Sequence, residues 1–282
     1  MLQLRLCTRL TCLPNSVGQM SALVSLDLGS CHALTALPET VGQLARLTAL
    51  ACSALLGLPA SVGQLTALER LDLSMCMELV RLPESMGQLA GLTRLDLTSC
   101  VALTGLPEST GRLTGLKILK LNACRELTCL PASMGQLAAL EMLSLSQCSS
   151  LTCLPPWLGQ LAALTTLDLG WCTRLTRLPE SVGRLSALTS LHVNNCRVLA
   201  RLPASLDQLT ELTWLDLNHC EALPEAVAVW AAGLAAANTR LAALCPRILA
   251  LLVIGHRRHR ARLPPELWRL VYAALRGLST KE

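Results

Sequence analysis

The chain has 282 residues, a formal net charge of +5, and a composition that is 52% hydrophobic but only 2% aromatic. This length allows one elongated domain or two compact ones, and a chain without phenylalanine must build its core from aliphatic side chains. The charge is uneven, because residues 1–237 carry 15 basic and 17 acidic side chains, whereas residues 238–282 carry 9 and 2. We therefore expect a near-neutral body followed by a basic segment with a separate role.

Fourteen cysteines would suggest a disulfide framework in a short secreted chain, but other features of this sequence point inside the cell. The opening residues lack the long apolar stretch of a signal peptide, and none of the six asparagines begins an N-x-S/T site. The longest charge-free apolar run near the C-terminus, AVAVWAAGLAAAN, is too short to span a bilayer. We expect a cytoplasmic protein with reduced thiols and no membrane span, and a nuclear location is also possible.

From its first residues the chain repeats the unit LxxLxLxxCxxLxxLPxxxGxL, with a strict period of 24 residues from Cys76 to Cys220. A period of this length indicates a solenoid, and the pattern is that of leucine-rich repeats. The alternation in LxxLxL predicts a short strand with inward leucines, and Leu-Pro predicts a short helical turn that begins at the proline. The glycine near its end (position 42, for example) predicts a positive φ there, and Asp207 replaces it in the last full unit.

These units predict an α/β solenoid shaped as a curved horseshoe, with a parallel sheet on the concave side and short helical turns on the convex side. The leucine-rich repeat domain is expected over residues 1–224, as about nine repeats plus a partial first one. The unit at 45–65 has only 21 residues, so Cys52 falls at an inward leucine position and the column of cysteines should break there. Since no polar cap precedes the first unit, we expect either a longer gene product or a partner at that end.

The consensus resembles two groups of leucine-rich repeat proteins. Units with a cysteine after the strand and Leu-Pro before the turn are similar to those of plant disease-resistance receptors, and the LPxxxGxL half is similar to Scribble-like and Ras-suppressor-like intracellular proteins. The resemblance covers about residues 1–224 and implies protein recognition on the concave sheet. The nucleotide-binding module of the receptors is not found, because no GxxxxGKS/T motif occurs.

The repeated cysteines are predicted to be structural. No CxxC pair suggests zinc, and thiols that point the same way on adjacent parallel strands have poor geometry for a disulfide. We expect each thiol to fill a small space and donate a weak hydrogen bond to a turn carbonyl. This cysteine ladder comprises Cys7, Cys31, Cys76, Cys100, Cys124, Cys148, Cys172, Cys196 and Cys220. Cys129 and Cys153 form a second column just before Leu-Pro, where oxidation is conceivable.

The outward strand positions are the candidate partner surface. They could be a solvated face with ion pairs such as Arg70 with Asp96, or they could bind a partner; two of the five tryptophans cluster toward the C-terminal end of this face, where exposed aromatic rings are common anchors. Trp214 could instead pack against the C-terminal helices. The predicted partner-binding residues are Arg70, Asp72, Arg94, Asp96, Asp168, Trp171, His192, Asn194, Trp214, Asp216, Asn218 and His219.

Residues 225–282 are predicted to form a helical C-terminal segment, with helices near 224–237, 240–255 and 263–277 and the basic run HRRHRAR between the last two. The segment could cap the solenoid. It also resembles a SOCS box, which would dock an Elongin-type adaptor, and its LPPELWRLV stretch resembles the opening of an F-box, which would dock a Skp-type adaptor. The residues that match the SOCS-box pattern are Leu241, Cys245, Leu249, Leu263 and Pro264.

We predict a non-enzymatic protein-interaction module, without cofactor, metal or small-molecule substrate, that binds a partner protein on its concave face in intracellular signalling or immune-type recognition. The alternative is a substrate receptor of a cullin ubiquitin ligase. Catalysis is not favoured, because the sequence contains no serine nucleophile elbow, HExxH, phosphate loop or paired-carboxylate motif. Nucleic-acid binding is not favoured either, because no basic groove is interleaved with aromatic residues.

Overall fold

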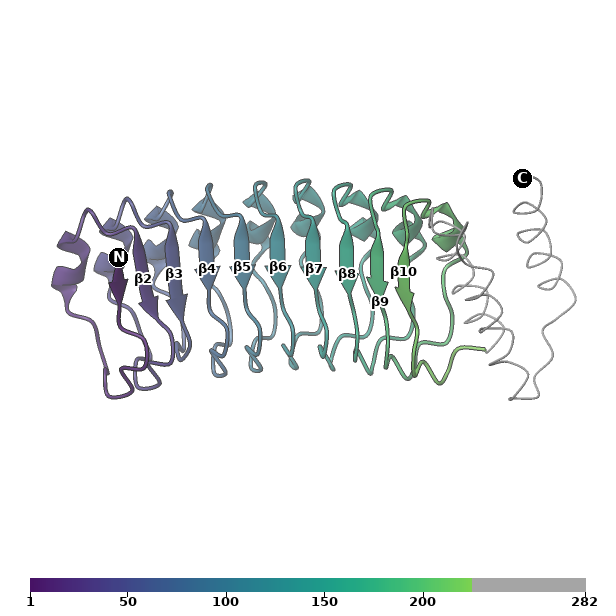
Figure 1. The fold of residues 1–282 in the computed structure, drawn as a ribbon, viewed down its shortest axis with the longest axis horizontal. Helices are drawn as coiled ribbons and strands as arrows, with labels where there is room; N and C mark the ends of the chain where they lie inside the picture. Colours follow the sequence, from purple (N-terminus) through teal and green to yellow (C-terminus); the bar gives the residue numbers. More distant parts are fainter. Residues whose placement is uncertain (225–282) are drawn as a thin grey trace, which may run out of the picture.

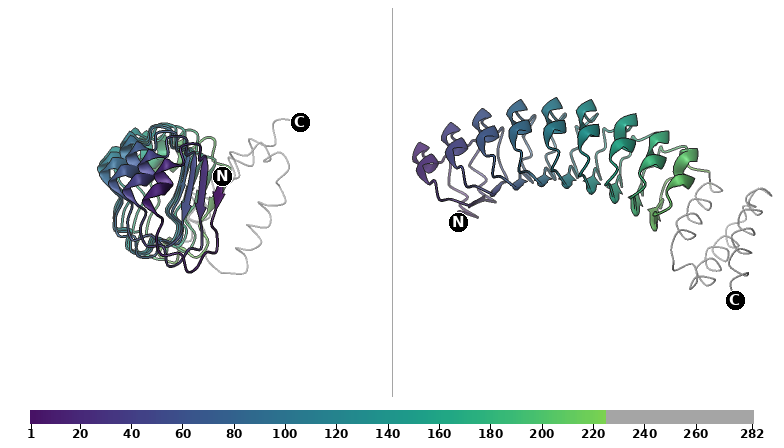
Figure 2. Two further views of the ribbon diagram at one scale, coloured as in Figure 1. Left: turned by 90° about the vertical axis from the view of Figure 1, so that its left-hand side faces the viewer. Right: turned by 90° about the horizontal axis from the view of Figure 1, so that it is seen from above.

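The structure, a computed structural model, describes residues 1–224 as an open arc of ten parallel strands that pair in chain order in one sheet (Figure 1). Seen from above, the strands line the concave side and the helical turns line the convex side (Figure 2). The strands are β1 (Leu2–Gln3), β2 (Ser25–Leu28), β3 (Ala49–Cys52), β4 (Arg70–Asp72), β5 (Arg94–Asp96), β6 (Ile118–Lys120), β7 (Met142–Ser144), β8 (Thr166–Asp168), β9 (Ser190–His192) and β10 (Trp214–Asp216). The predicted leucine-rich repeat solenoid is therefore confirmed.

Leucines of successive repeats stack in register to form the core. The central leucine of each strand pairs with that of the next, as in Leu71 with Leu95 and Leu95 with Leu119, and all three side chains are buried. Full burial of one leucine side chain contributes about 1.5–3 kcal/mol. Because a single unit cannot bury its own leucines, stacking is what removes them from water.

The convex side carries a series of short 3-10 helices. They are η1 (Asn15–Gln19), η2 (Glu39–Gln43), η3 (Ala60–Gln64), η4 (Glu84–Gln88), η5 (Glu108–Arg112), η6 (Ala132–Gln136), η7 (Pro156–Gln160), η8 (Glu180–Arg184) and η9 (Ala204–Gln208). The recurring Leu-Pro did predict a helical turn, but the proline lies one residue before the turn begins. Pro38 is extended, with φ −69° and ψ 150°, and its carbonyl accepts the Val41 N–H at 3.0 Å.

The repeated glycines do not adopt the positive φ that the sequence predicted. No glycine in residues 1–224 has a positive φ. They lie inside the 3-10 helices, where the next repeat approaches closely: a Cβ on Gly42 would lie 2.5 Å from the Ser61 carbonyl oxygen. Glycine is thus required here by close packing and not by backbone conformation. Asp207 occupies this position in η9 and is exposed.

Glutamates at the start of one 3-10 helix accept hydrogen bonds from the first amides of the next 3-10 helix. The Glu180 carboxylate accepts the N–H groups of Ala204 at 3.4 Å and Ser205 at 3.2 Å, which begin η9. Glu39 and Glu108 make equivalent bonds to the following repeat. The hydrogen bond from the Ser205 N–H holds the pKa of Glu180 below its usual value. Each such carboxylate therefore caps a helix in another repeat and couples the two.

The 21-residue unit keeps its place in the sheet. Cys52 pairs in register with Leu28 and is 3% exposed, so the predicted inward position of Cys52 is confirmed. The unit is three residues shorter than the others at the turn after the strand, and there the Ser53 hydroxyl oxygen, not a backbone carbonyl, accepts the Ser30 N–H at 2.7 Å. The Ser53 side chain thereby takes the place of the backbone carbonyl that accepts this bond in other repeats, such as the Thr98 carbonyl that accepts the Met75 N–H.

Within residues 1–224 no helix is long and apolar enough to cross a bilayer. The predicted helices beyond Pro224, and with them the boundary between the repeat domain and a C-terminal cap or adaptor segment, lie outside the described residues.

Adding a methyl group to one convex-side glycine should destabilise the array. We expect Gly42→Ala to lower the free energy of unfolding by about 1–3 kcal/mol, because its Cβ would meet the Ser61 backbone. Gly105 is the matched control: a Cβ there would have nothing within 4 Å, and Gly105→Ala should change stability by about 0.5 kcal/mol or less. Urea denaturation followed by circular dichroism compares the two, and equal effects would contradict the packing role.

Removing one inter-repeat cap should produce a pH-dependent loss of stability. Because the folded pKa of Glu180 is lowered, the contribution of its carboxylate is complete above the unfolded pKa, about 4.3, and is lost as pH falls through the folded pKa. We expect Glu180→Gln to melt at a lower temperature than the wild type at pH 7, and this difference in melting temperature to shrink as pH falls below about 4.3. Glu126→Gln, at an exposed glutamate, should melt at the same temperature as the wild type both at pH 7 and at low pH. If the difference in melting temperature between Glu180→Gln and the wild type stayed the same at low pH, the capping role would be contradicted.

Candidate functional site: the concave surface

The alternation of each strand positions the predicted partner residues. The central leucine of a strand is buried, and the residues on either side of it point to the concave surface. The register places Arg70 beside Arg94 and Asp72 beside Asp96 on β4 and β5, and Asp168, His192 and Asp216 in one row on β8 to β10. The predicted residues therefore form two groups, with β6 and β7 between them.

The first group is organised around Asp96, which is only 7% exposed. Its carboxylate lies 3.4 Å from Arg94 Nη2 and 3.6 Å from Lys120 Nζ, and its Oδ1 accepts the Thr98 N–H at 3.1 Å. The predicted ion pair of Arg70 with Asp96 is wrong, because Arg94 on the same strand and Lys120 on the next one occupy the carboxylate. Arg70 is exposed and makes no ion pair with any described residue.

The aspartates at or near the ends of the strands have a structural task that the sequence analysis missed. Asp72 Oδ1 accepts the Ser74 N–H at 2.9 Å, and Asp168 Oδ1 accepts the Gly170 N–H at 3.0 Å. Asp27, Asp96 and Asp216 make the same bond to the amide two residues later. Each carboxylate thus holds the chain as it leaves the strand. The recurring LDL was the available signal.

The second group contains four rings that we call the aromatic patch: Trp171, His192, Trp214 and His219. Trp171 and Trp214 are 46% and 58% exposed, although the chain is almost without aromatic residues. The His192 and Trp214 rings lie 6.4 Å apart with an interplanar angle of 40°, and His192 Nε2 is 2.9 Å from the Ser190 hydroxyl. These rings are spread over three neighbouring repeats, and exposed tryptophans of this kind are typical protein-binding anchors.

A turn with an unusual backbone presents two of these rings. The residue before each ladder cysteine has φ near +60°, and the series comprises Leu6, Ser30, Met75, Ser99, Ala123, Gln147, Trp171, Asn195 and His219. The Trp171 N–H donates to the Asn194 carbonyl at 2.7 Å, and the Asn195 N–H donates to the Asn218 carbonyl at 2.7 Å. Such a φ costs a non-glycine residue about 1–2 kcal/mol, so the repeat-to-repeat bonds must maintain it. Asn194 is half-buried and Asn218 exposed at the edge of the patch.

The ladder cysteines point into the core. The Cys148 thiol donates to the Leu121 carbonyl at 3.1 Å, and the Cys172 thiol donates to the Leu145 carbonyl at 3.2 Å. The acceptor lies 27 residues earlier and opens the turn after the preceding strand, since the Leu121 carbonyl also accepts the Cys124 N–H at 3.2 Å, so the predicted bond to a turn carbonyl is confirmed. Beside the short unit, Cys76 donates to the Cys52 carbonyl at 3.4 Å, only 24 residues earlier. The remaining bonds of this kind come from Cys31, Cys100, Cys124, Cys196 and Cys220, and Cys7 is half-buried.

Burial makes these thiols poor nucleophiles and poor metal ligands. It raises the pKa of Cys76 to about 11 and those of Cys124 and Cys196 to about 12, because a thiolate loses its hydration in the core. Residues 1–224 contain no group of three or more histidine, cysteine or acidic side chains placed to hold a metal ion. The possible adaptor-docking residues, Leu241, Cys245, Leu249, Leu263 and Pro264, lie outside the described residues.

Thiol alkylation should separate the two classes of cysteine. In the native protein at pH 8 we expect iodoacetamide to modify the exposed Cys12, Cys129 and Cys153 within minutes, and the buried Cys100 and Cys148 at least about 100-fold more slowly. Peptide mass spectrometry gives the rate at each site, and unfolding in urea should make all rates similar. Rapid native modification of Cys148 would contradict its burial.

Comparisons with known proteins give concordant matches. A family profile described as "Disease resistance protein RPS4B-like, leucine-rich repeats" matches residues 64–155. Among solved structures, the leucine-rich repeat domain of the type III effector XopL is 30% identical with a TM-score of 0.63, and the alignment covers 76% of this chain and 75% of that one. A search of curated proteins returned no match.

Two further structures show looser likeness. A leucine-rich repeat protein of Leptospira interrogans is 26% identical with a TM-score of 0.40, over 83% of this chain and 81% of that one. The Arabidopsis receptor kinase HAESA, solved with the peptide hormone IDA and the co-receptor SERK1, is 22% identical with a TM-score of 0.47, over 73% of this chain and 44% of that one.

Proposed function

The chain belongs to the leucine-rich repeat family, and from this premise we propose that it is a protein-interaction module that binds a partner protein on its concave surface through the aromatic patch. One observation carries the proposal: Trp171 and Trp214, two repeats apart on the concave side, are 46% and 58% exposed in a chain that is almost without aromatic residues. An exposed tryptophan ring leaves apolar surface in water, which is unfavourable, and burying that surface against a partner contributes free energy of binding.

The rigidity of the sheet supports this role. Strands β8 to β10 are held by in-register backbone pairing, so the rings above them are positioned before any partner arrives. Binding to a preformed surface loses little conformational entropy. The exposed Arg70 and Asp72, four or more repeats away, can add polar contacts with a large partner.

The proposed setting is intracellular signalling or immune-type recognition. The profile match to disease-resistance repeats over residues 64–155 supports the setting. The hydrogen bonds donated by the ladder thiols require reduced cysteine, which supports a place in a reducing compartment such as the cytoplasm.

Truncating a patch tryptophan should remove partner binding without unfolding the array. With the full chain as bait, we expect partners recovered by the wild type to fall about tenfold or more with Trp214→Ala or Trp171→Ala, because each ring supplies a buried anchor. Quantitative mass spectrometry of the recovered proteins measures the effect, and thermal melting checks the fold.

The matched control is Met20→Ala. Met20 is a large apolar side chain that is 42% exposed at the end of η1 on the convex side, so its removal should leave recovery unchanged. Partners that survive both tryptophan substitutions and are lost with Met20→Ala would refute the assignment to the concave surface.

A further inference from the structure

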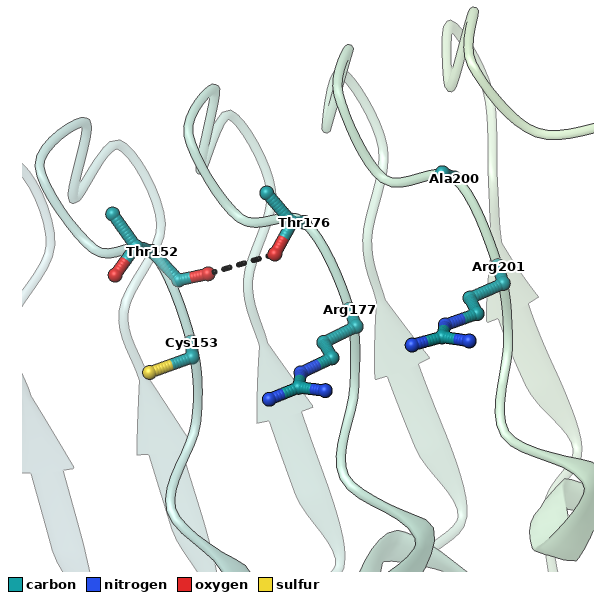
Figure 3. A pocket seen from close by; sticks show the side chains of 6 residues that line it. All are labelled: Thr152, Cys153, Thr176, Arg177, Ala200 and Arg201. Carbon is teal, nitrogen blue, oxygen red and sulfur yellow. Dashed lines mark hydrogen bonds between the residues drawn. The ribbon is translucent and has the colours of Figure 1, made fainter.

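A shallow pocket of about 570 Å³ lies away from the concave surface, on the segments that run from the cysteine turn to the 3-10 helix. Figure 3 shows it in front of the strands, across three successive repeats. It is lined by Thr152, Cys153, Thr176, Arg177, Ala200 and Arg201. These residues are exposed, and none of them belongs to the aromatic patch or to the cysteine ladder.

Backbone pairing sets the geometry of this pocket. Arg177 and Arg201 form a parallel bridge, the Thr176 N–H donates to the Thr152 carbonyl at 3.2 Å, and the Ala200 N–H donates to the Thr176 carbonyl at 3.3 Å. Paired segments lie about 4.8 Å apart, so the two arginines are held side by side. Both side chains extend in the same direction, toward the preceding repeat (Figure 3).

The two guanidiniums lack a carboxylate partner. Neither makes an ion pair with a described residue. Arg201 helps to lower the pKa of Glu180, but that carboxylate is already engaged by the Ala204 and Ser205 amides, whose hydrogen bonds have the larger effect. At the position equivalent to Glu180 in the repeat before Arg177, the residue is Pro156. Two like charges held in register repel one another unless an anion lies between them.

The ligand that suits this arrangement is one small dianion. Arginine pairs bind phosphate through several charge-assisted hydrogen bonds, and two adjacent guanidiniums can donate to different oxygens of the same group. The positive charge does not continue along the row, because the equivalent positions in the three preceding repeats are Gly105, Cys129 and Cys153. A membrane surface or a nucleic acid would need a longer basic track.

We propose that Arg177 and Arg201 clamp a single phosphate monoester group, either free or carried on a serine or threonine side chain. The group lies between the guanidiniums, with the Cys153 thiol at the edge of the pocket. This site is independent of the concave partner site, so loss of either one leaves the other intact.

Binding is tested by calorimetric titration of the full chain with O-phosphoserine at low ionic strength. We expect Arg177→Gln and Arg201→Gln each to weaken binding about tenfold or more, and the double variant to abolish it. Arg81→Gln is the matched control, since Arg81 is exposed at the same repeat position between Gly57 and Gly105 and has no second guanidinium beside it. The affinity of Arg81→Gln for O-phosphoserine should match that of the wild type.

Two further arms sharpen the test. Since the second pKa of a phosphate monoester is near 6, its affinity should fall between pH 7.5 and pH 5, whereas that of sulfate should stay constant. Comparing inorganic phosphate with a phosphoserine peptide identifies the source: tighter binding of the peptide indicates a protein-borne group, and equal binding indicates the free ion. Thermal melting confirms that each variant is folded.

The outcomes that overturn the proposal are equally specific. Phosphoserine affinity that persists in the double variant would assign binding to other basic residues, such as those at 256–262. Sedimentation with phosphatidylserine vesicles that is lost in Arg177→Gln and Arg201→Gln, without phosphoserine binding, would replace the small dianion by a membrane surface. No measurable binding by the wild type would refute the site itself.

Discussion

The parallel register of the strands is the constraint on which the other features depend. It places Leu95 between Leu71 and Leu119, so that each repeat completes the core of its neighbours. The same stacking brings the Cys148 thiol to a carbonyl of the preceding repeat and the Glu180 carboxylate to the helix of the following one. Turn hydrogen bonds lie within each repeat, whereas the strand pairing, the thiol bonds and the glutamate caps all cross between repeats. Removing one rung therefore weakens both neighbours.

Inward positions were predictable from the sequence, and most outward ones were not. A period of 24 residues with leucine at fixed places predicts a stack of equivalent repeats, because only stacking buries those side chains. The positive φ falls on residues whose side chains are as different as those of Leu6, Ala123 and Trp171, so only the position before the ladder cysteine marks it, and repeat-to-repeat hydrogen bonds impose it. The glycine at position 42 looked like the residue for that conformation, but the neighbouring backbone explains it instead.

Candidate functional residues could be located but not interpreted before the stacking was known. The aspartates at 72 and 168 looked like partner contacts, yet each carboxylate accepts an amide two residues later. Arg177 and Arg201 are ordinary surface arginines when considered singly, and only the pairing of residues 24 apart makes them a charged pair. The tryptophans were recognisable from composition alone, since aromatic side chains are so scarce in this chain.

The spacing of the repeats also restricts the shape of a concave partner. Neighbouring strands are about 4.8 Å apart, so equivalent outward side chains such as Asp168, His192 and Asp216 recur at that interval along the array. An extended peptide advances about 3.3 Å per residue and falls out of phase with this interval after one step. A helix laid along the array brings residues back to one face about every 5.4 Å, so it also falls out of phase within a few repeats. Neither regular structure therefore keeps step with the array for more than a few repeats, so a partner's contacts with equivalent side chains gather on a few neighbouring repeats at a time.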